Sequence, residues 1–269
     1  MQNFFISVTG ISHVQEAEWL RQISEQFMPP DGYQFNVGIL ASEKTLDSAG
    51  PSHPRFPAFA ELLRILERMQ PAFTPVIHYS SGEDTPLSKQ ISALLEQSRI
   101  YQDNLCRWMQ INVRTPDPDE LAKLKQTFPR LVLILQIPLW QDSFRDSQII
   151  QQFVNRYHPY ADYFIIDPSG GRGRDVNKDI LNLIKPLIDQ GLPLCRLVFA
   201  GGLSHDNADE RVNTSGRFFS DFRFSIDAER RLRGGKYNGE KIGDQVNPEK
   251  AKQYLEKACR AFSELKENH

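Results

Sequence analysis

The sequence alternates apolar runs of strand length with segments of helical periodicity, and this alternation constrains the fold more than any other feature. Eight apolar runs begin at Phe4, Tyr33, Ala72, Arg107, Arg130, Ala161, Leu194 and Arg223, with starts about 23 to 39 residues apart. A helix-period segment follows each run, and the one at residues 205–219 has the weakest pattern. Units of this kind are typical of parallel sheets with right-handed crossovers.

Eight comparable units within 269 residues predict a single (β/α)8 barrel, the TIM-barrel fold, with residues 1–269 forming one domain. The alternative is an open, doubly wound sheet, which is disfavoured because no linker or change in composition divides the chain. Helix-end signals agree with these units. Asp119 and Asn247 are expected to cap helices, and Gly191 is expected just beyond one.

Composition excludes several functional classes. Lysine and arginine total 32 against 34 acidic residues, so the net charge of −2 offers no electrostatic argument for nucleic-acid binding. The first residues lack a signal-peptide pattern and no run of 18 apolar residues occurs, which predicts a cytoplasmic protein without membrane association. Cys106, Cys195 and Cys259 are far apart and are expected to be buried, reduced thiols. We expect a monomer or a homodimer.

In such a barrel the functional groups lie where the strands end, so the residues closing each run are the candidate site residues. They are Thr9, Glu43, His78, Asn112, Arg114, Gln136, Asp167 and Asp227. Asp167 fits a catalytic acid as well as it fits a carboxylate that caps the next turn. Asp227 is a catalytic candidate with a structural alternative, and His78 is expected to pack or hydrogen-bond.

Glycines concentrate after the sixth and seventh runs. Gly201 and Gly202 follow the seventh run, and Gly170, Gly171 and Gly173 follow the sixth, in one loop with Arg172 and Arg174. Bare backbone N–H groups ahead of a helix that starts near Ser204 to Asn207 predict a phosphate site, although the glycines alone would also suit a tight turn. The expected ligand is a small phosphorylated metabolite. Gly202→Val is expected to block that ligand without unfolding the barrel.

Other barrel chemistries lack their residues. None of the eight runs contains a lysine, which argues against a Schiff-base aldolase. Only one histidine, His78, lies in a run, so no metal site is expected, and no cofactor is expected either.

Several segments resemble the phosphoribosylanthranilate isomerase family. FAGGLSHDN at residues 199–207 is similar to the family's "AGGL…N", and FIIDPSGGRGRD at 164–175 is similar to its "LLD…GGTG…D". FISVTGIS at 5–12, SHPRF at 52–56 and WMQIN at 108–112 resemble the family's opening, its "SPRY" and its fourth strand. The closing helix resembles "DPEKI…F", so the resemblance covers nearly the whole chain.

The resemblance implies an Amadori rearrangement, in which a ring opens and an aldose becomes a ketose. Asp167 matches the family's general acid, Arg55 matches the arginine that meets the substrate carboxylate, and the glycines match the phosphate-binding loops. Gln110 and Asn112 fall in the segment that resembles the family's fourth strand, and Arg230 stands where the family has serines. All three residues are therefore further substrate-binding candidates. The resemblance makes Thr9 a catalytic candidate too, because it occupies the place of the cysteine base.

A threonine hydroxyl is too weakly acidic to replace a thiolate base. If a base acts from another position, Glu43, Asp227 and Glu229 are the candidates. Three functions therefore stay open: an isomerase of a phosphorylated sugar derivative, a protein that binds a phosphorylated metabolite without catalysis, and a lyase that uses Asp167. The residue at position 9 predicts low or absent phosphoribosylanthranilate isomerase activity.

Overall fold

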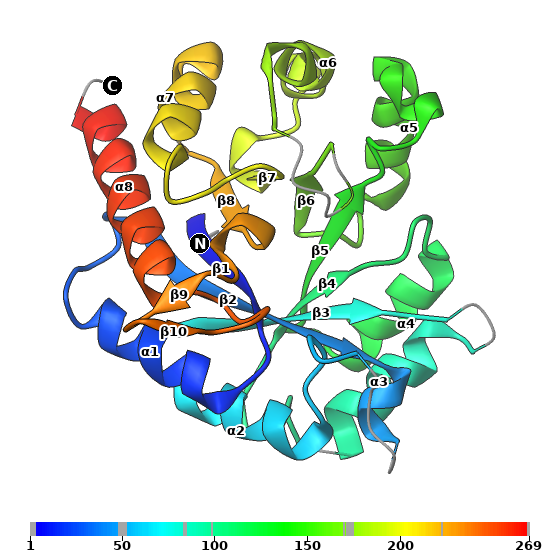
Figure 1. The fold of residues 1–269 in the computed structure, drawn as a ribbon. Coiled ribbons are helices and arrows are strands. Elements are labelled where there is room, and N and C mark those ends of the chain that lie inside the picture. The colour runs from blue at the N-terminus through cyan, green and yellow to red at the C-terminus, as the bar shows by residue number, and fades with distance from the viewer. Residues whose placement is uncertain are drawn as a thin grey trace.

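The computed structural model describes residues 4–47, 53–82, 85–97, 99–168, 170, 175–221 and 223–267. Eight parallel strands pair in chain order and close into a barrel, with helices around the outside (Figure 1). Closure comes from pairing of the first strand with the eighth, where Ile6 lies opposite Ile226 and Ser7 opposite Asp227. The predicted single (β/α)8 barrel is confirmed.

The strands and helices follow the predicted alternation. The strands are β1 (Phe4–Ile11), β2 (Tyr33–Ser42), β3 (Thr74–Ser80), β4 (Trp108–Ile111), β5 (Val132–Ile137), β6 (Tyr163–Ile166), β7 (Leu197–Ala200) and β8 (Ser225–Ala228). The helices around them are α1 (Val14–Ser24), α2 (Phe59–Met69), α3 (Leu87–Gln97), α4 (Pro118–Thr127), α5 (Ser147–Tyr157), α6 (Lys178–Asp189), α7 (Ala208–Phe219) and α8 (Pro248–Glu267). Residues 205–219, the segment with the weakest helical pattern in the sequence, contain helix α7.

Alternation along each strand separates two apolar cores. One face of the strands packs against the helices in a large cluster, and the other face fills the barrel interior. Inside the barrel, Phe5 meets Trp108 and Tyr163 edge-on, at ring-centroid distances of 5.7 and 5.4 Å. This aromatic layer fills the interior near the strand starts, so the space that remains lies toward the strand ends.

The helix-end signals are partly corrected. Asn247 caps α8, because its side-chain oxygen accepts the backbone N–H of Glu249 at 3.0 Å, and Gly191 follows α6 with a φ of +104°. Asp119 is not a cap. Asp117 caps α4 and accepts the N–H of Asp119 at 3.0 Å, because the intervening Pro118 suits the first helical position.

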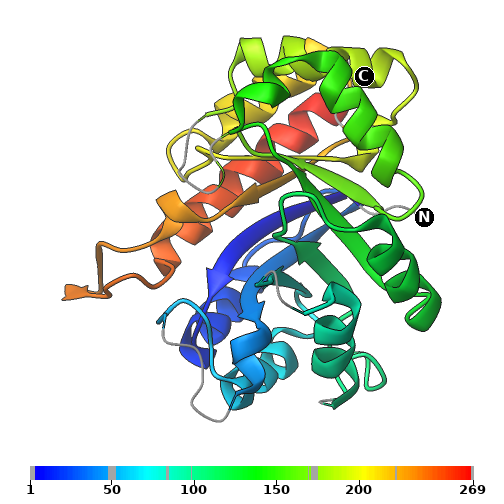
Figure 2. The ribbon, with the colours of Figure 1, turned by 90° about the vertical axis from the view of Figure 1, so that its right-hand side faces the viewer.

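The connection between β8 and α8 contains a small hairpin, β9 (Lys236–Tyr237) paired with β10 (Glu240–Lys241), which projects from the barrel (Figure 2).

Among the described residues, no helix is both long and apolar enough to span a bilayer.

The expectation of buried thiols holds for one of the two cysteines whose side chains are described. Cys106 is buried, and this burial raises the pKa of its thiol to about 12. Cys259 is only half-buried and packs against the edge of the large apolar cluster. The side chain of Cys195 lies outside the described part.

Candidate active site

Asp167 and Asp227 come together at the carboxyl end of the barrel. Asp167 directly follows β6 and Asp227 lies within β8, and both belong to the inward-facing set of their strands. They line a cavity of about 300 Å³ together with His78 of β3 and with residues within and after β4 and β5. A small recess of about 40 Å³ shares both carboxylates and adds Gly201, Gly202 and Arg230. The two acids therefore lie between a polar cavity and the glycine turn.

Asp227 is buried and titrates unusually high for an aspartate. Burial raises its pKa from the usual 3.8 to about 6, and the nearby charge of Asp167 acts in the same direction. Hydrogen bonds from Thr9 and Ser7 oppose this shift, because they stabilise the carboxylate form. The Thr9 hydroxyl donates to Asp227 Oδ1 at 2.7 Å. A carboxylate near this pKa can exchange a proton at neutral pH.

Gly38 on β2 makes room for this arrangement. A β-carbon at this position would lie 2.1 Å from Thr9 Oγ1 and 2.7 Å from His78 Nε2. With hydrogen in its place, Thr9 Oγ1 and His78 Nε2 approach to 3.5 Å across the strand. Burial lowers the pKa of His78 to about 3, so its imidazole is neutral at physiological pH. His78 therefore packs beside the acids as a neutral polar group.

Amide side chains form the wall of the cavity around β4 and β5. Gln136 donates to Asp167 Oδ2 at 3.2 Å, and Gln110 donates to Asn112 Oδ1 at 2.8 Å. These hydrogen bonds orient the amide groups. The bond between Gln110 and Asn112 does not use the Gln110 carbonyl oxygen or the Asn112 amino group. Together with neutral His78, they give the cavity a surface suited to hydroxyl groups.

The glycines serve the chain's own packing as well as the recess. Gly201 and Gly202 have φ values of +84° and +70°. A β-carbon at Gly202 would fall 1.8 Å from Asp175 Oδ1 and 2.8 Å from the Asp175 Cα, so the expectation that Gly202→Val acts only on a ligand is wrong. Gly170 lies against the ring of Trp140, 3.0 Å from where its β-carbon would be. Gly171, Gly173, Arg172 and Arg174 lie outside the described residues.

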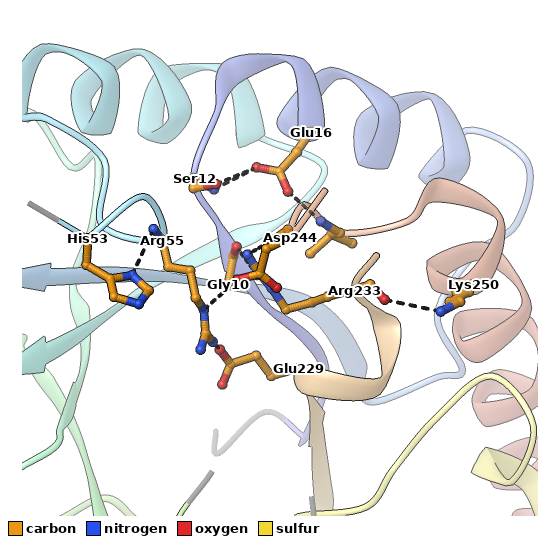
Figure 3. Close-up of polar contacts among 10 residues, drawn as sticks. Gly10, Ser12, Glu16, His53, Arg55, Glu229, Arg233, Asp244 and Lys250 are labelled. Atoms are coloured by element: carbon orange, nitrogen blue, oxygen red, sulfur yellow. Dashed lines mark hydrogen bonds and ion pairs between the residues drawn. The ribbon is translucent and has the colours of Figure 1, made fainter. Parts of the chain in front are cut away.

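Arg55 reaches the mouth and forms an ion pair with Glu229, in the loop after β8 (Figure 3). Its guanidinium Nε is also 3.9 Å from Asp244. Buried Arg233 donates to the carbonyl of Gly10 and to Asp244 Oδ1, the latter at 3.1 Å (Figure 3). This network ties the start of the hairpin segment to the end of β1. Its anchor, Arg233, belongs to the run of arginines after β8, and its contact with Gly10 does not follow from the sequence pattern.

The three alternative bases differ in position. Asp227 and Glu229 line both the cavity and the recess, whereas Glu43 lines neither and lies beside Gly82. Because Arg55 engages Glu229, Asp227 is the better placed of the two. Within the described ranges, no group of three or more histidine, cysteine or acidic side chains is arranged to hold a metal ion.

These features define a TIM-barrel protein with two acids and a glycine turn at its mouth. The structure described as TrpF from Jonesia denitrificans matches it with a TM-score of 0.59 and 14% identity, over 97% of this chain and 98% of that chain. Phosphoribosyl anthranilate isomerase from Thermotoga maritima matches with a TM-score of 0.61 and 15% identity, over 95% and 98%. No protein-family model and no curated protein matches the sequence significantly. The resemblance found in the sequence motifs is thus supported at the level of the fold.

Proposed function

We propose that this protein binds a phosphorylated sugar derivative at the barrel mouth and isomerises it, with Asp167 as the acid and Asp227 as the base. The observation that carries this proposal is the shared position of the two carboxylates, which line one cavity and also the recess beside Gly201 and Gly202. The names of the two structural neighbours, phosphoribosyl anthranilate isomerase and TrpF, add support for this class of reaction.

In the proposed reaction Asp167 gives a proton to the ring oxygen of the sugar, and the bond between that oxygen and the anomeric carbon breaks. Asp227 then takes the proton from the adjacent carbon, and the electron pair of that C–H bond forms the enol or enamine. Asp227 then returns a proton to the former anomeric carbon while the Asp167 carboxylate takes the proton of the hydroxyl on the adjacent carbon, and this yields the ketose form. Asp227 suits the base role because it becomes anionic above pH about 6.

The phosphate is proposed to lie at the turn formed by Gly201 and Gly202. The recess there is bordered by Arg230, and helix α7 begins a few residues later at Ala208. Backbone N–H groups, the positive end of a helix and an arginine all favour a phosphate group. Thr9 is not required as a base in this scheme. Its hydroxyl instead holds the Asp227 carboxylate by the bond at 2.7 Å.

Exchange of a substrate proton tests the proposal. Aldose phosphates are incubated with the protein in deuterium oxide, and loss of the proton next to the anomeric carbon is followed by NMR. Wild type is expected to show exchange and ketose formation, and Asp227→Asn is expected to lose both while still binding the ligand in calorimetry. Binding without exchange in wild type would favour the non-catalytic function, and cleavage products would favour a lyase.

A further inference from the structure

His78 on β3 lines the cavity of about 300 Å³ that holds Asp167 and Asp227. Its imidazole also borders a smaller space of about 10 Å³ deeper in the barrel, which Ser7, Gln110 and Asp227 line as well. The ring therefore forms part of the floor of the mouth cavity, on the side of the proposed base.

The Thr9 hydroxyl is the contact that His78 shares with Asp227. The Thr9 oxygen lies 2.7 Å from Asp227 Oδ1 and 3.5 Å from His78 Nε2. A sugar carbon that presents its C–H bond to Asp227 carries its own hydroxyl only one bond away. Because both side chains reach the same oxygen atom, that sugar hydroxyl comes within reach of the imidazole.

The hydrogen bond to Asp227 also decides which imidazole nitrogen carries the proton. Thr9 has one hydroxyl proton and donates it to Asp227, so its oxygen can only accept from His78. The proton of the neutral imidazole is therefore assigned to Nε2, and the lone pair to Nδ1. Burial holds the pKa of His78 at about 3, so Nδ1 accepts a hydrogen bond at neutral pH without becoming protonated.

Nδ1 of His78 has no hydrogen-bond partner among the described residues. It is not one of the unpaired side-chain nitrogens that are closed to solvent, so it is open to a space that the ring borders. An acceptor in such a site gains from a hydroxyl donor, since leaving it unpaired costs its solvation.

The amide groups of the cavity wall are already oriented by other contacts. Gln136 donates to Asp167 at 3.2 Å. Gln110 donates to Asn112 at 2.8 Å. His78, in contrast, offers an acceptor without a described partner beside the proposed base.

We propose that His78 is a further catalytic residue, whose Nδ1 accepts a hydrogen bond from the hydroxyl on the carbon that Asp227 deprotonates. This inference rests on the proposed function, because it assumes a sugar phosphate with its C–H bond at Asp227. The hydroxyl keeps its proton in this contact and gives it to Asp167 in the last step. The contact orients the C–H bond toward Asp227 and selects sugars that carry a hydroxyl on that carbon.

Calorimetry with ribose 5-phosphate and 2-deoxyribose 5-phosphate tests this contact, because the two probes differ only in that hydroxyl. Wild type is expected to bind ribose 5-phosphate about tenfold more tightly. His78→Leu removes the acceptor and is expected to bind the two probes within about twofold of each other. At saturating ribose 5-phosphate, this variant is also expected to exchange the substrate proton at least about tenfold more slowly.

Two further variants distinguish the nitrogen atoms of His78. His78→Asn places an amide oxygen near the position of Nδ1 and is expected to keep a preference of about fivefold. His78→Gln places its amide near Nε2 instead and is expected to lose the preference, which decides the question if the leucine variant does not fold. His158→Leu, at the exposed C-terminal end of α5, is the control and is expected to keep the wild-type preference.

The outcomes separate the two proposals. If wild type prefers ribose 5-phosphate and the leucine and glutamine variants keep that preference, the role of His78 is wrong and the proposed function stands. Equal binding of both probes by wild type has the same meaning. If wild type binds neither probe, the sugar-phosphate ligand of the proposed function is wrong, and the role of His78 is rejected with it.

Discussion

Thr9 on β1 donates a hydrogen bond of 2.7 Å to Asp227 on β8, and this contact joins the first and last strands of the barrel at its mouth. Thr9, which the motif resemblance aligns with a cysteine base, thus holds a carboxylate on the neighbouring strand. Because Thr9 stabilises the Asp227 carboxylate, most of the tests below concern Asp227 and its neighbours.

The first expected outcome is a pH profile of the proton exchange with an acidic limb near pH 6. Burial raises the pKa of Asp227 to about 6, and only the ionised carboxylate can accept a proton. The value of kcat/KM should therefore fall about tenfold for each pH unit below that point. Activity that stays constant down to pH 4.5 would show that another group is the base.

Thr9→Val is expected to move that acidic limb to higher pH. The substitution removes the hydroxyl that stabilises the Asp227 carboxylate, so the pKa of Asp227 should rise further. Thr9→Ser keeps the hydroxyl and is the control, with a limb close to that of wild type. If valine and serine give the same profile, the hydrogen bond does not tune the acid.

Asp227→Asn is expected to stabilise the fold at neutral pH. The folded-state pKa of Asp227 lies above the unfolded value of 3.8, so this group favours folding fully below pH 3.8 and loses that contribution as pH rises through about 6. Above pH 6 wild type carries an ionised, buried carboxylate, and the amide removes a cost of about 3 kcal/mol. Urea denaturation at pH 4 and pH 8 measures this, and an equal effect at both values would contradict it.

Gly38→Ala is expected to destabilise the protein and to impair catalysis. The added methyl group would lie 2.1 Å from the Thr9 hydroxyl oxygen, so Thr9 or the strand must shift. Overpacking of this kind typically costs about 1–3 kcal/mol. The midpoint of urea denaturation and the pH profile are the two measurements. Values unchanged from wild type would show that the close approach at Gly38 is not needed.

Phosphoribosylanthranilate isomerase activity is expected to be low or absent, because a threonine hydroxyl cannot act as the thiolate does. The measurement is growth of a tryptophan auxotroph that lacks this isomerase and carries the gene for this protein. Thr9→Cys, tested in parallel, shows whether the thiol alone restores the reaction. Robust growth with the native sequence would refute the expectation.

The sequence by itself determined the barrel and the strand ends at which the candidate residues lie. Alternation of period two and helical periodicity are local properties, so the eight units, Asn247 as a cap and Asp167 at a strand end were predictable. Local patterns also located Gly201 and Gly202, but they assigned α4 the wrong cap, because Asp117 and Asp119 both precede its apolar face.

Tertiary structure alone decided which of these residues meet. Thr9 and Asp227 are 218 positions apart in the chain, and only closure of β1 on β8 in one register brings the hydroxyl to the carboxylate. Likewise, nothing local places Asp175 against Gly202 or Glu229 against Arg55. Contacts between distant strand ends depend on register and barrel closure, because these set the spacing and depth of side chains that local patterns leave undefined.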